Sequence, residues 1–295
     1  MRKSAIRHLA ITDEPAIVAA AFFESKVQIW SWKTSQQIGE FETILDFGGR
    51  RLALSPDGRI CITGSYSRGL AAYSIPDGRL LWHRRDLRKL QLIYLNALGS
   101  EIYCGDDRPS VHIIETETGN SLGKVARADR IVPSQTGPHQ LVSRRQDAYT
   151  VTGPGEFAIS AVSFGLLDAA FSPEAVCLAE PKTGIRCIDL VSGSVLWHHQ
   201  TLGANHLAFN SLDMRFYCVG GLDTEPHESS LIRLASNLYD CERVVTLSHS
   251  YVAAFSPSGA NLITMGGEVY ESSTGNLLTI LEVPQRDYPD ALPPE

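Results

Sequence analysis

Paired histidines are the first residues in this chain that suggest chemistry, because imidazole is a common metal ligand. A histidine follows a tryptophan at Trp82-His83, and two histidines do so at residues 197–199. Adjacent residues of a strand point to opposite faces, so His198 and His199 cannot both face one ion from a strand. The pattern therefore favours a tryptophan that packs between structural units, followed by a solvated histidine, over a metal site.

The six cysteines form a second candidate set. None belongs to a C-x-x-C pair, and most lie inside apolar, strand-like runs. A zinc site needs closer ligand spacing, and a disulfide framework suits smaller secreted chains. We therefore expect small thiols packed in a core, with no disulfide and no zinc. They are Cys61, Cys104, Cys177, Cys187, Cys218 and Cys241.

Motifs for metalloprotease and nucleotide chemistry are absent from the sequence. It contains no H-E-x-x-H and no G-x-x-x-x-G-K-[ST]. Residues 153–155 (Gly-Pro-Gly) imitate the start of a dinucleotide fingerprint, but a strand-like run follows instead of a helix N-terminus. A turn between strands is expected there, and the sequence assigns no catalytic residue, no cofactor and no metal.

Charge is distributed unevenly along the chain. The net charge is −7, which disfavours nucleic acid and anionic membranes as partners, yet residues 50–150 hold 15 Lys and Arg against 10 Asp and Glu. The longest apolar run has eight residues, whereas a membrane span needs roughly 20. The N-terminal residues also lack the apolar stretch of a signal peptide, so a cytoplasmic location is expected.

One turn signature recurs along the whole chain. An apolar residue, then Ser or Asn, then turn residues occur at 54–58, 171–174 and 255–259, with weaker copies at 11–14, 95–99 and 209–213. The intervals are 43, 41, 76, 38 and 46 residues, and the double interval places a skipped copy near Ser134. A second turn series, at 76–78, 117–119, 191–193 and 273–275, runs in phase with the first. Such residues favour tight turns, because Pro presets φ, Asp or Ser bonds the backbone, and Gly accepts positive φ.

Four short strands per roughly 40 residues, repeated seven times, predict an all-β fold: a single seven-bladed β-propeller with four antiparallel strands per blade. A Pro-rich acidic tail follows at 284–295; it is not expected to pack as a strand, but to be disordered or laid along a groove. Both terminal blades supply four strands of their own, which leaves the closure of the ring open. The expected blades are about 5–43, 50–86, 90–126, 130–165, 167–202, 205–247 and 250–283, in one domain spanning 1–283.

Several of these turns resemble known repeats. Residues 55–58 (Ser-Pro-Asp-Gly) and 27–35 resemble WD40 and YVTN repeats, and residues 77–82 and 192–197 resemble quinoprotein-type propellers. The chain thus resembles the WD40/YVTN/quinoprotein-like superfamily, which implies a propeller that binds other proteins. It departs from the WD40 pattern, because the Trp-Asp pair survives only as Trp30-Ser31 and the Gly-His pair is absent.

Candidate partner-binding residues follow from propeller geometry, because the loops after strands d and b of each blade share one rim. Basic residues gather in these loops of blades 2 and 3, which favours a protein partner with an acidic surface; scattered solvated charge is the alternative. The set comprises Arg68, Arg84, Arg85, Arg88, Lys89, Arg108, Lys124, Arg127 and Arg130. An acidic insert in blade 6 can hold a metal or a basic partner, or be a solvated loop, through Asp223, Glu225, His227 and Glu228.

These features favour a non-catalytic platform for protein–protein interaction. A scaffold and a stoichiometric inhibitor, such as a toxin-neutralising immunity protein, both fit this description. The alternative is a small hydrolase or lyase, similar to a lactonase, with its site at the mouth of the propeller channel. Three or more converging ionisable groups at that mouth would favour the enzyme, and a rim of arginines with exposed aromatic residues would favour the binder.

Overall fold

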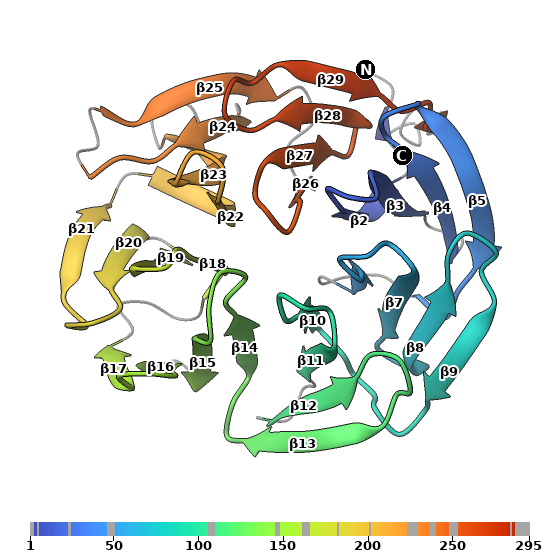
Figure 1. Ribbon diagram of the computed structural model, residues 1–295, viewed down its shortest axis with the longest axis horizontal. Helices are drawn as coiled ribbons and strands as arrows, with labels where there is room; N and C mark the ends of the chain where they lie inside the picture. The colour runs from blue at the N-terminus through green and yellow to red at the C-terminus, as the bar shows by residue number, and fades with distance from the viewer. Residues whose placement is uncertain are drawn as a thin grey trace, which may run out of the picture.

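Seven four-stranded antiparallel sheets surround a central axis in the computed structural model, which confirms the predicted seven-bladed propeller (Figure 1). The structure describes residues 3–4, 6–22, 25–45, 51–105, 110–144, 148–160, 166–181, 183–200, 202–222, 229–236, 240–247, 253–283 and 285–286. None of these lies in a helix long and apolar enough to cross a membrane.

Each blade is one uninterrupted stretch of chain, with its first strand next to the axis. Blades 1 and 2 contain β2 (Ile6–Ile11), β3 (Ile17–Phe22), β4 (Lys26–Ser31) and β5 (Gln36–Glu42), then β6 (Leu52–Leu54), β7 (Ile60–Ser65), β8 (Gly69–Ser74) and β9 (Leu80–Arg84). Blades 3 and 4 contain β10 (Leu92–Leu95), β11 (Glu101–Gly105), β12 (Ser110–Glu115) and β13 (Ser121–Ala126), then β14 (Arg130–Pro133), β15 (Gln140–Arg144), β16 (Ala148–Thr152) and β17 (Phe157–Ser160). Blade 5 contains β18 (Asp168–Phe171), β19 (Ala175–Glu180), β20 (Gly184–Asp189) and β21 (Val195–His199). Blades 6 and 7 contain β22 (Leu202–Asn210), β23 (Arg215–Leu222), β24 (Ser229–Arg233) and β25 (Glu242–Leu247), then β26 (Ala253–Phe255), β27 (Asn261–Thr264), β28 (Glu268–Glu271) and β29 (Leu277–Ile280).

The repeated Ser-Pro turn is the tight hairpin between the first two strands of a blade. In blade 2 the Ser55 hydroxyl donates to Asp57 Oδ1 at 2.6 Å and accepts the Ile60 amide at 2.9 Å. In blade 7 the Ser256 hydroxyl accepts the Asn261 amide in the same way, at 3.1 Å. The serine satisfies backbone groups that the turn leaves without ladder partners, which explains its recurrence.

The second turn series joins strands c and d and packs against the preceding blade. Gly78 has a φ of +68°, and a Cβ there would lie 2.2 Å from Phe41 Cβ on β5 of blade 1. Gly119 meets Trp82 of blade 2 in the same manner, and the Trp82 indole N–H donates to the Thr116 carbonyl at 2.9 Å. The recurrent glycine therefore marks the seam at which one blade fits against its neighbour.

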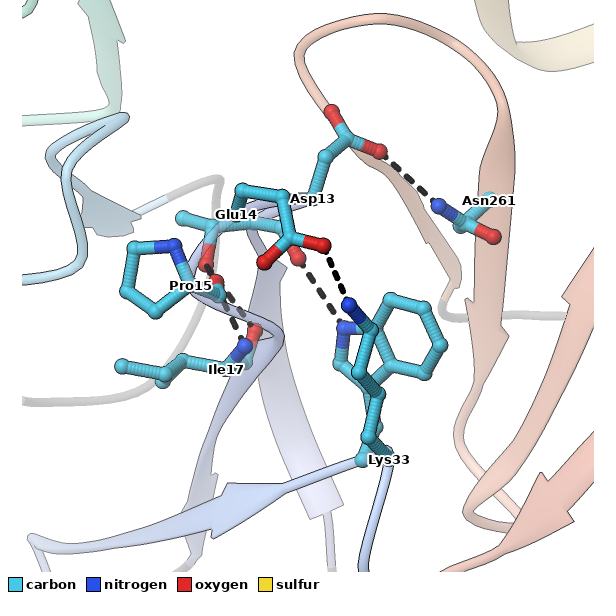
Figure 2. A network of polar contacts seen from close by, with 8 residues as sticks. Asp13, Glu14, Pro15, Ile17, Lys33 and Asn261 are labelled. Atoms are coloured by element: carbon cyan, nitrogen blue, oxygen red, sulfur yellow. Dashed lines mark hydrogen bonds and ion pairs between the residues drawn. The ribbon is translucent and has the colours of Figure 1, made fainter.

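The ring is closed by contacts between blades 1 and 7. Asp13 accepts the Asn261 side-chain amide at 2.8 Å (Figure 2). It also accepts the Ser258 amide at 3.0 Å. The hydroxyls of Ser35 and Thr279 also hydrogen-bond across this seam. Buried Trp30 packs in one apolar cluster with residues of β27 and β28, so side chains rather than a shared blade close the circle.

The two ends of the described chain add a short ribbon. Strand β1 (Lys3–Ser4) pairs with β30 (Gln285–Arg286) in antiparallel orientation. The prediction that the tail does not pack as a strand is therefore wrong for residues 285–286. Their partner lies at the other end of the chain, where closure of the ring delivers it, and backbone pairing needs no apolar side chains. Residues 284 and 287–295 lie outside the described part.

Candidate functional site

The expected basic rim begins on blade 2, where two loops touch. The Lys89 amide, after strand d, donates to the Tyr66 carbonyl in the b–c turn at 2.7 Å. Gly69, at the end of that turn, lies close beneath the Arg84 carbonyl. Loops separated in sequence therefore form one continuous surface on this face of blade 2.

Exposed cations and one exposed aromatic ring lie in the two loops that form this surface. Tyr66 is 46% exposed, and the guanidinium of Arg51 lies beneath it, 5.9 Å from the ring centroid. We use the name blade 2 rim for Tyr66 together with four exposed basic residues, Arg68, Arg85, Arg88 and Lys89.

The remaining predicted basic residues divide into two groups. Lys124 and Arg127 of blade 3 are exposed, Arg127 with a φ of +60° in the loop after strand d. Arg84 instead forms an ion pair with Asp86 at 2.6 Å and donates to the Gly119 carbonyl at 2.8 Å. Arg130 donates to the Leu167 carbonyl of the segment leading into blade 5, at 3.0 Å. Arg84 and Arg130 thus join neighbouring blades.

Five predicted partner-binding residues cannot be placed. The b–c loops of blades 3 and 6 contain residues 106–109 and 223–228, which lie outside the described part of the chain. They include Arg108, Asp223, Glu225, His227 and Glu228.

The histidines that follow tryptophan lie beside backbone carbonyls, and the expectation of a solvated side chain is wrong for His199, which is buried, whereas His83 and His198 are half-buried. His83 Nε2 lies 2.8 Å from the Arg68 carbonyl, and His198 Nε2 lies 2.7 Å from the Thr183 carbonyl. Each joins strand d to the b–c turn of its own blade, because that turn leaves a carbonyl without a ladder partner. His199 is only 3% exposed and stacks on Trp197, with ring centroids 4.6 Å apart.

The cysteines occupy the core, as expected. Five are buried, Cys241 is half-buried, and all six are free thiols. Burial raises the pKa of Cys61, Cys177 and Cys218, which keeps these thiols protonated and unreactive. Among the described residues no group of three or more His, Cys, Asp or Glu side chains can hold a metal ion.

We predict that the folded protein exposes at most one thiol to a colorimetric disulfide reagent, Cys241, because burial shields the other five. Unfolding in guanidinium without reductant should release all six, and intact mass should be unchanged by reductant. Fewer than six thiols in denaturant, or stoichiometric zinc by elemental analysis, would contradict the assignment of these residues to a reduced core.

The central channel contains ionisable residues that the sequence analysis did not single out. All seven inner strands line a cavity of about 420 Å³. Its wall includes Arg7, His8, Arg51, Asp168 and His206, from blades 1, 2, 5 and 6. His8, Arg51 and Asp168 are buried, and Asp168 Oδ2 accepts the Leu207 amide at 2.8 Å.

A positional signal in the sequence identifies four of these residues. His8, Arg51, Asp168 and His206 each stand three positions before the apolar residue that opens the Ser-Pro-type turn. Figure 1 shows the inner strands arranged around the axis, and all seven contribute residues to the cavity wall. These four ionisable residues hold the same position near the start of their inner strands, and we call them the polar ring.

Comparison with known proteins supports the fold. No protein-family model matches the sequence, and no curated protein does either. Among solved structures, 1577 chains match, so this architecture is shared by many proteins. The fold shared with these structures is the seven-bladed β-propeller. One match is the β-propeller domain of Cps50 (Swd1) from Myceliophteria thermophila, at 13% identity and a TM-score of 0.69 over 93% of this chain and 95% of that one.

Proposed function

We propose that this protein is a non-catalytic platform that binds a partner protein through the blade 2 rim and the adjoining loop of blade 3. The observation that carries the proposal is the contact between the d–a segment and the b–c turn of blade 2, because these two touching loops carry four exposed cations and the exposed ring of Tyr66. Arginine and tyrosine are the residue types that most often dominate binding energy at protein interfaces.

The chemistry of this surface favours an acidic partner. The chain carries a net charge of −7, so the positive region is local and stands against an acidic background. Complementary charge steers association and fixes the register of the two surfaces. A protein with an acidic surface, met in the cytoplasm, is the partner that fits, and WD40-like propellers commonly serve as binding platforms of this kind.

Two roles fit such a platform: a scaffold and a stoichiometric inhibitor such as a toxin-neutralising immunity protein. A tagged copy expressed in the native host, purified at low salt and analysed by mass spectrometry, distinguishes them. A scaffold should recover several proteins together, whereas an inhibitor should recover one protein in equimolar amount whose activity falls on binding.

The alternative function, a small hydrolase or lyase at the channel mouth, is favoured by one observation. The polar ring meets the criterion of three or more converging ionisable groups. Incubating the protein with lactone and ester substrates, and measuring the protons that hydrolysis releases, tests this alternative. Turnover that disappears in Asp168→Asn and His206→Gln, with the fold retained, would establish it.

Reversing three rim charges is expected to weaken partner binding by at least about tenfold, which corresponds to about 1.4 kcal/mol. The variant is Arg85→Glu with Lys89→Glu and Arg127→Glu. Each exposed ion pair contributes only about 0.2–1 kcal/mol, so single changes should do little and the triple change should suffice. Affinity for the recovered partner should be measured by calorimetry across a salt series, because salt screens exposed charges.

A matched control reverses three cations on the opposite face. Lys33→Glu with Arg79→Glu and Arg215→Glu changes the net charge equally, but these residues lie in or beside the a–b and c–d turns. This control should retain the wild-type affinity. Unchanged affinity of a folded rim variant at low salt would overturn the proposed interface.

A further inference from the structure

The face of the propeller opposite the blade 2 rim carries the connections between strands a and b and between strands c and d of each blade. We call it the a–b face, and we propose that it docks a second protein, through a basic segment that inserts one bulky apolar side chain into the mouth of the central channel. This second partner is independent of the proposed function, because rim binding concerns the other face.

The channel is apolar at its end on the a–b face. In all seven blades the residue that opens the a–b turn belongs to the cavity wall, and all seven of these residues are apolar. They are Phe171, Phe209 and Phe255 in blades 5 to 7, and isoleucine, leucine, leucine and proline in blades 1 to 4. Phe209 also packs against Phe216, with ring centroids 5.1 Å apart, which holds this wall side chain in place. An apolar side chain that enters here exchanges water for apolar contacts, which favours binding.

The cavity extends from this apolar end to the surface of the a–b face. Pro56, Asn96, Gln135 and Pro257 belong both to the a–b turns and to the cavity wall, and Gln135 is exposed. None of these four residues carries a charge. The whole cavity, of about 420 Å³, falls within the roughly 300–1,000 Å³ range of ligand pockets, so it has room for one aromatic or branched side chain.

Two leucines occupy a position of the a–b turn that is polar in the other five blades. Three residues after the apolar residue that opens the turn, Glu14, Asp57 and Glu174 occupy blades 1, 2 and 5, and threonine and serine occupy blades 4 and 7. Leu98 and Leu212 hold the same position in blades 3 and 6, and they are 85% and 79% exposed. At such exposure they contribute little to the core. Exposed apolar side chains beside an apolar pocket are typical of a binding surface.

The charge of the a–b face identifies the kind of segment that fits it. The a–b and c–d connections contain nine Asp and Glu residues against three Lys and Arg residues. Two of the three bases already form ion pairs on this face, Lys33 with Glu14 and Arg59 with Asp57. The excess of acids therefore favours a partner that carries Lys or Arg around its apolar side chain.

Two exposed acids come together at the seam between blades 4 and 5. Glu174 lies in the a–b turn of blade 5, and Glu156 lies in the c–d turn of blade 4. Leu190 contacts both turns, because its amide donates to the Glu174 carbonyl at 2.8 Å and its carbonyl oxygen lies 4.0 Å from where a Cβ on Gly155 would stand. A basic segment that enters the mouth over blade 5 would meet both carboxylates.

The probe is a synthetic peptide, acetyl-Gly-Lys-Lys-Phe-Lys-Lys-Gly-amide. Two matched peptides carry serine in place of the phenylalanine, or glutamate in place of every lysine. Calorimetry on the full-length protein at low salt should show binding of the phenylalanine peptide and at least about tenfold weaker binding of both matched peptides. Added salt should weaken binding, because it screens exposed charges. Equal binding of the phenylalanine and serine peptides, or no binding of the phenylalanine peptide at millimolar concentration, would overturn the proposal.

Exposed apolar residues locate the site on the protein. Leu98→Ser with Leu212→Ser removes both leucines of the a–b turns and should weaken binding of the phenylalanine peptide by at least about tenfold, while the thermal unfolding temperature stays unchanged. Val191→Ser is the control, because Val191 is 89% exposed in a c–d turn, nearer the outer edge of its blade. This control should bind the peptide as the wild type does, and equal binding by the leucine variant would contradict the proposed site.

Charge reversal at the seam between blades 4 and 5 tests the electrostatic part. Glu156→Lys with Glu174→Lys should weaken binding of the phenylalanine peptide by at least about fivefold at low salt. Glu40→Lys with Glu42→Lys changes the net charge equally on the exposed outer strand of blade 1 and should have little effect. Equal losses in the two variants would mean that the peptide responds to net charge alone, which would contradict docking at the mouth.

Binding at the a–b face is separable from binding at the rim. The leucine variant should keep its affinity for the rim partner, and the triple rim variant should bind the phenylalanine peptide at least as well as the wild type does. Sedimentation of the protein alone distinguishes another occupant, a second copy of the chain. Self-association that Leu98→Ser with Leu212→Ser abolishes would assign the a–b face to that second copy and overturn the proposal.

Discussion

Glu180→Gln is expected to lower the free energy of unfolding by about 3–5 kcal/mol, because it leaves a buried guanidinium without its counter-charge. Arg186 Nε and Nη2 contact the two Glu180 oxygens at 2.6 Å and 2.9 Å, and the side chains are 7% and 0% exposed. Arg186 Nη2 also donates to the Ser160 carbonyl of blade 4 at 3.1 Å, so the loss should loosen the seam between blades 4 and 5. Urea denaturation with a constant m-value measures the change.

Two comparisons define the control for this prediction. Glu40→Gln removes an exposed ion pair with Lys26, 3.3 Å apart, and should change stability by less than about 1 kcal/mol. Adding Arg186→Met to Glu180→Gln removes the unpaired buried charge and should recover part of the loss. A loss for Glu180→Gln no larger than that for Glu40→Gln would show that solvent reaches this pair.

Gly78→Ala is expected to destabilise the fold by about 2–5 kcal/mol through two combined effects. A residue with a Cβ costs roughly 1–2 kcal/mol in the left-handed region, and overpacking costs roughly 1–3 kcal/mol more. Gly78 has a φ of +68°, and the new Cβ would lie 2.2 Å from Phe41 Cβ across the seam between blades 1 and 2. Thermal and urea unfolding both measure the loss.

Gly155 provides the matched control in the corresponding turn of blade 4. Its φ is +81°, but among the described residues a Cβ there would meet nothing closer than the Leu190 carbonyl oxygen at 4.0 Å. Gly155→Ala should therefore cost only the backbone part, about 1–2 kcal/mol. In a Phe41→Gly background, which removes the clashing Cβ, Gly78→Ala should fall to the same value; if the two glycines behave alike in the wild type, the seam is not tightly packed.

The architecture was predictable because its signals are local. The Ser55 and Ser256 turns are specified by residues within five positions of one another, and seven such turns at regular intervals allow few other folds. The proximity of the loops that contain Lys89 and Tyr66 could also be predicted, because propeller geometry places both loops on one rim.

Features that depend on strand register or on distant strands were not predicted. The His83 contact with the Arg68 carbonyl depends on the register of one hairpin, and the β1–β30 ribbon pairs opposite ends of the chain. Arg51 and Asp168 line the same channel only because blades 2 and 5 surround one axis. The sequence shows that both residues hold the same position in their repeats, but only the assembled propeller shows that this position lines the channel.

The seam between blades 1 and 7 has a consequence for the order in which the chain is synthesised. Each intermediate blade can pack against its neighbour as soon as the next repeat leaves the ribosome, whereas Asp13 waits for Ser258, 245 residues later. Until then the apolar side of blade 1 that includes Leu9 and Trp30 lacks the cover of β27 and β28. Nascent chains that end within blade 6 should therefore be the species that chaperones hold and that aggregate when synthesis stalls, because this unclosed edge is exposed for nearly the whole of translation.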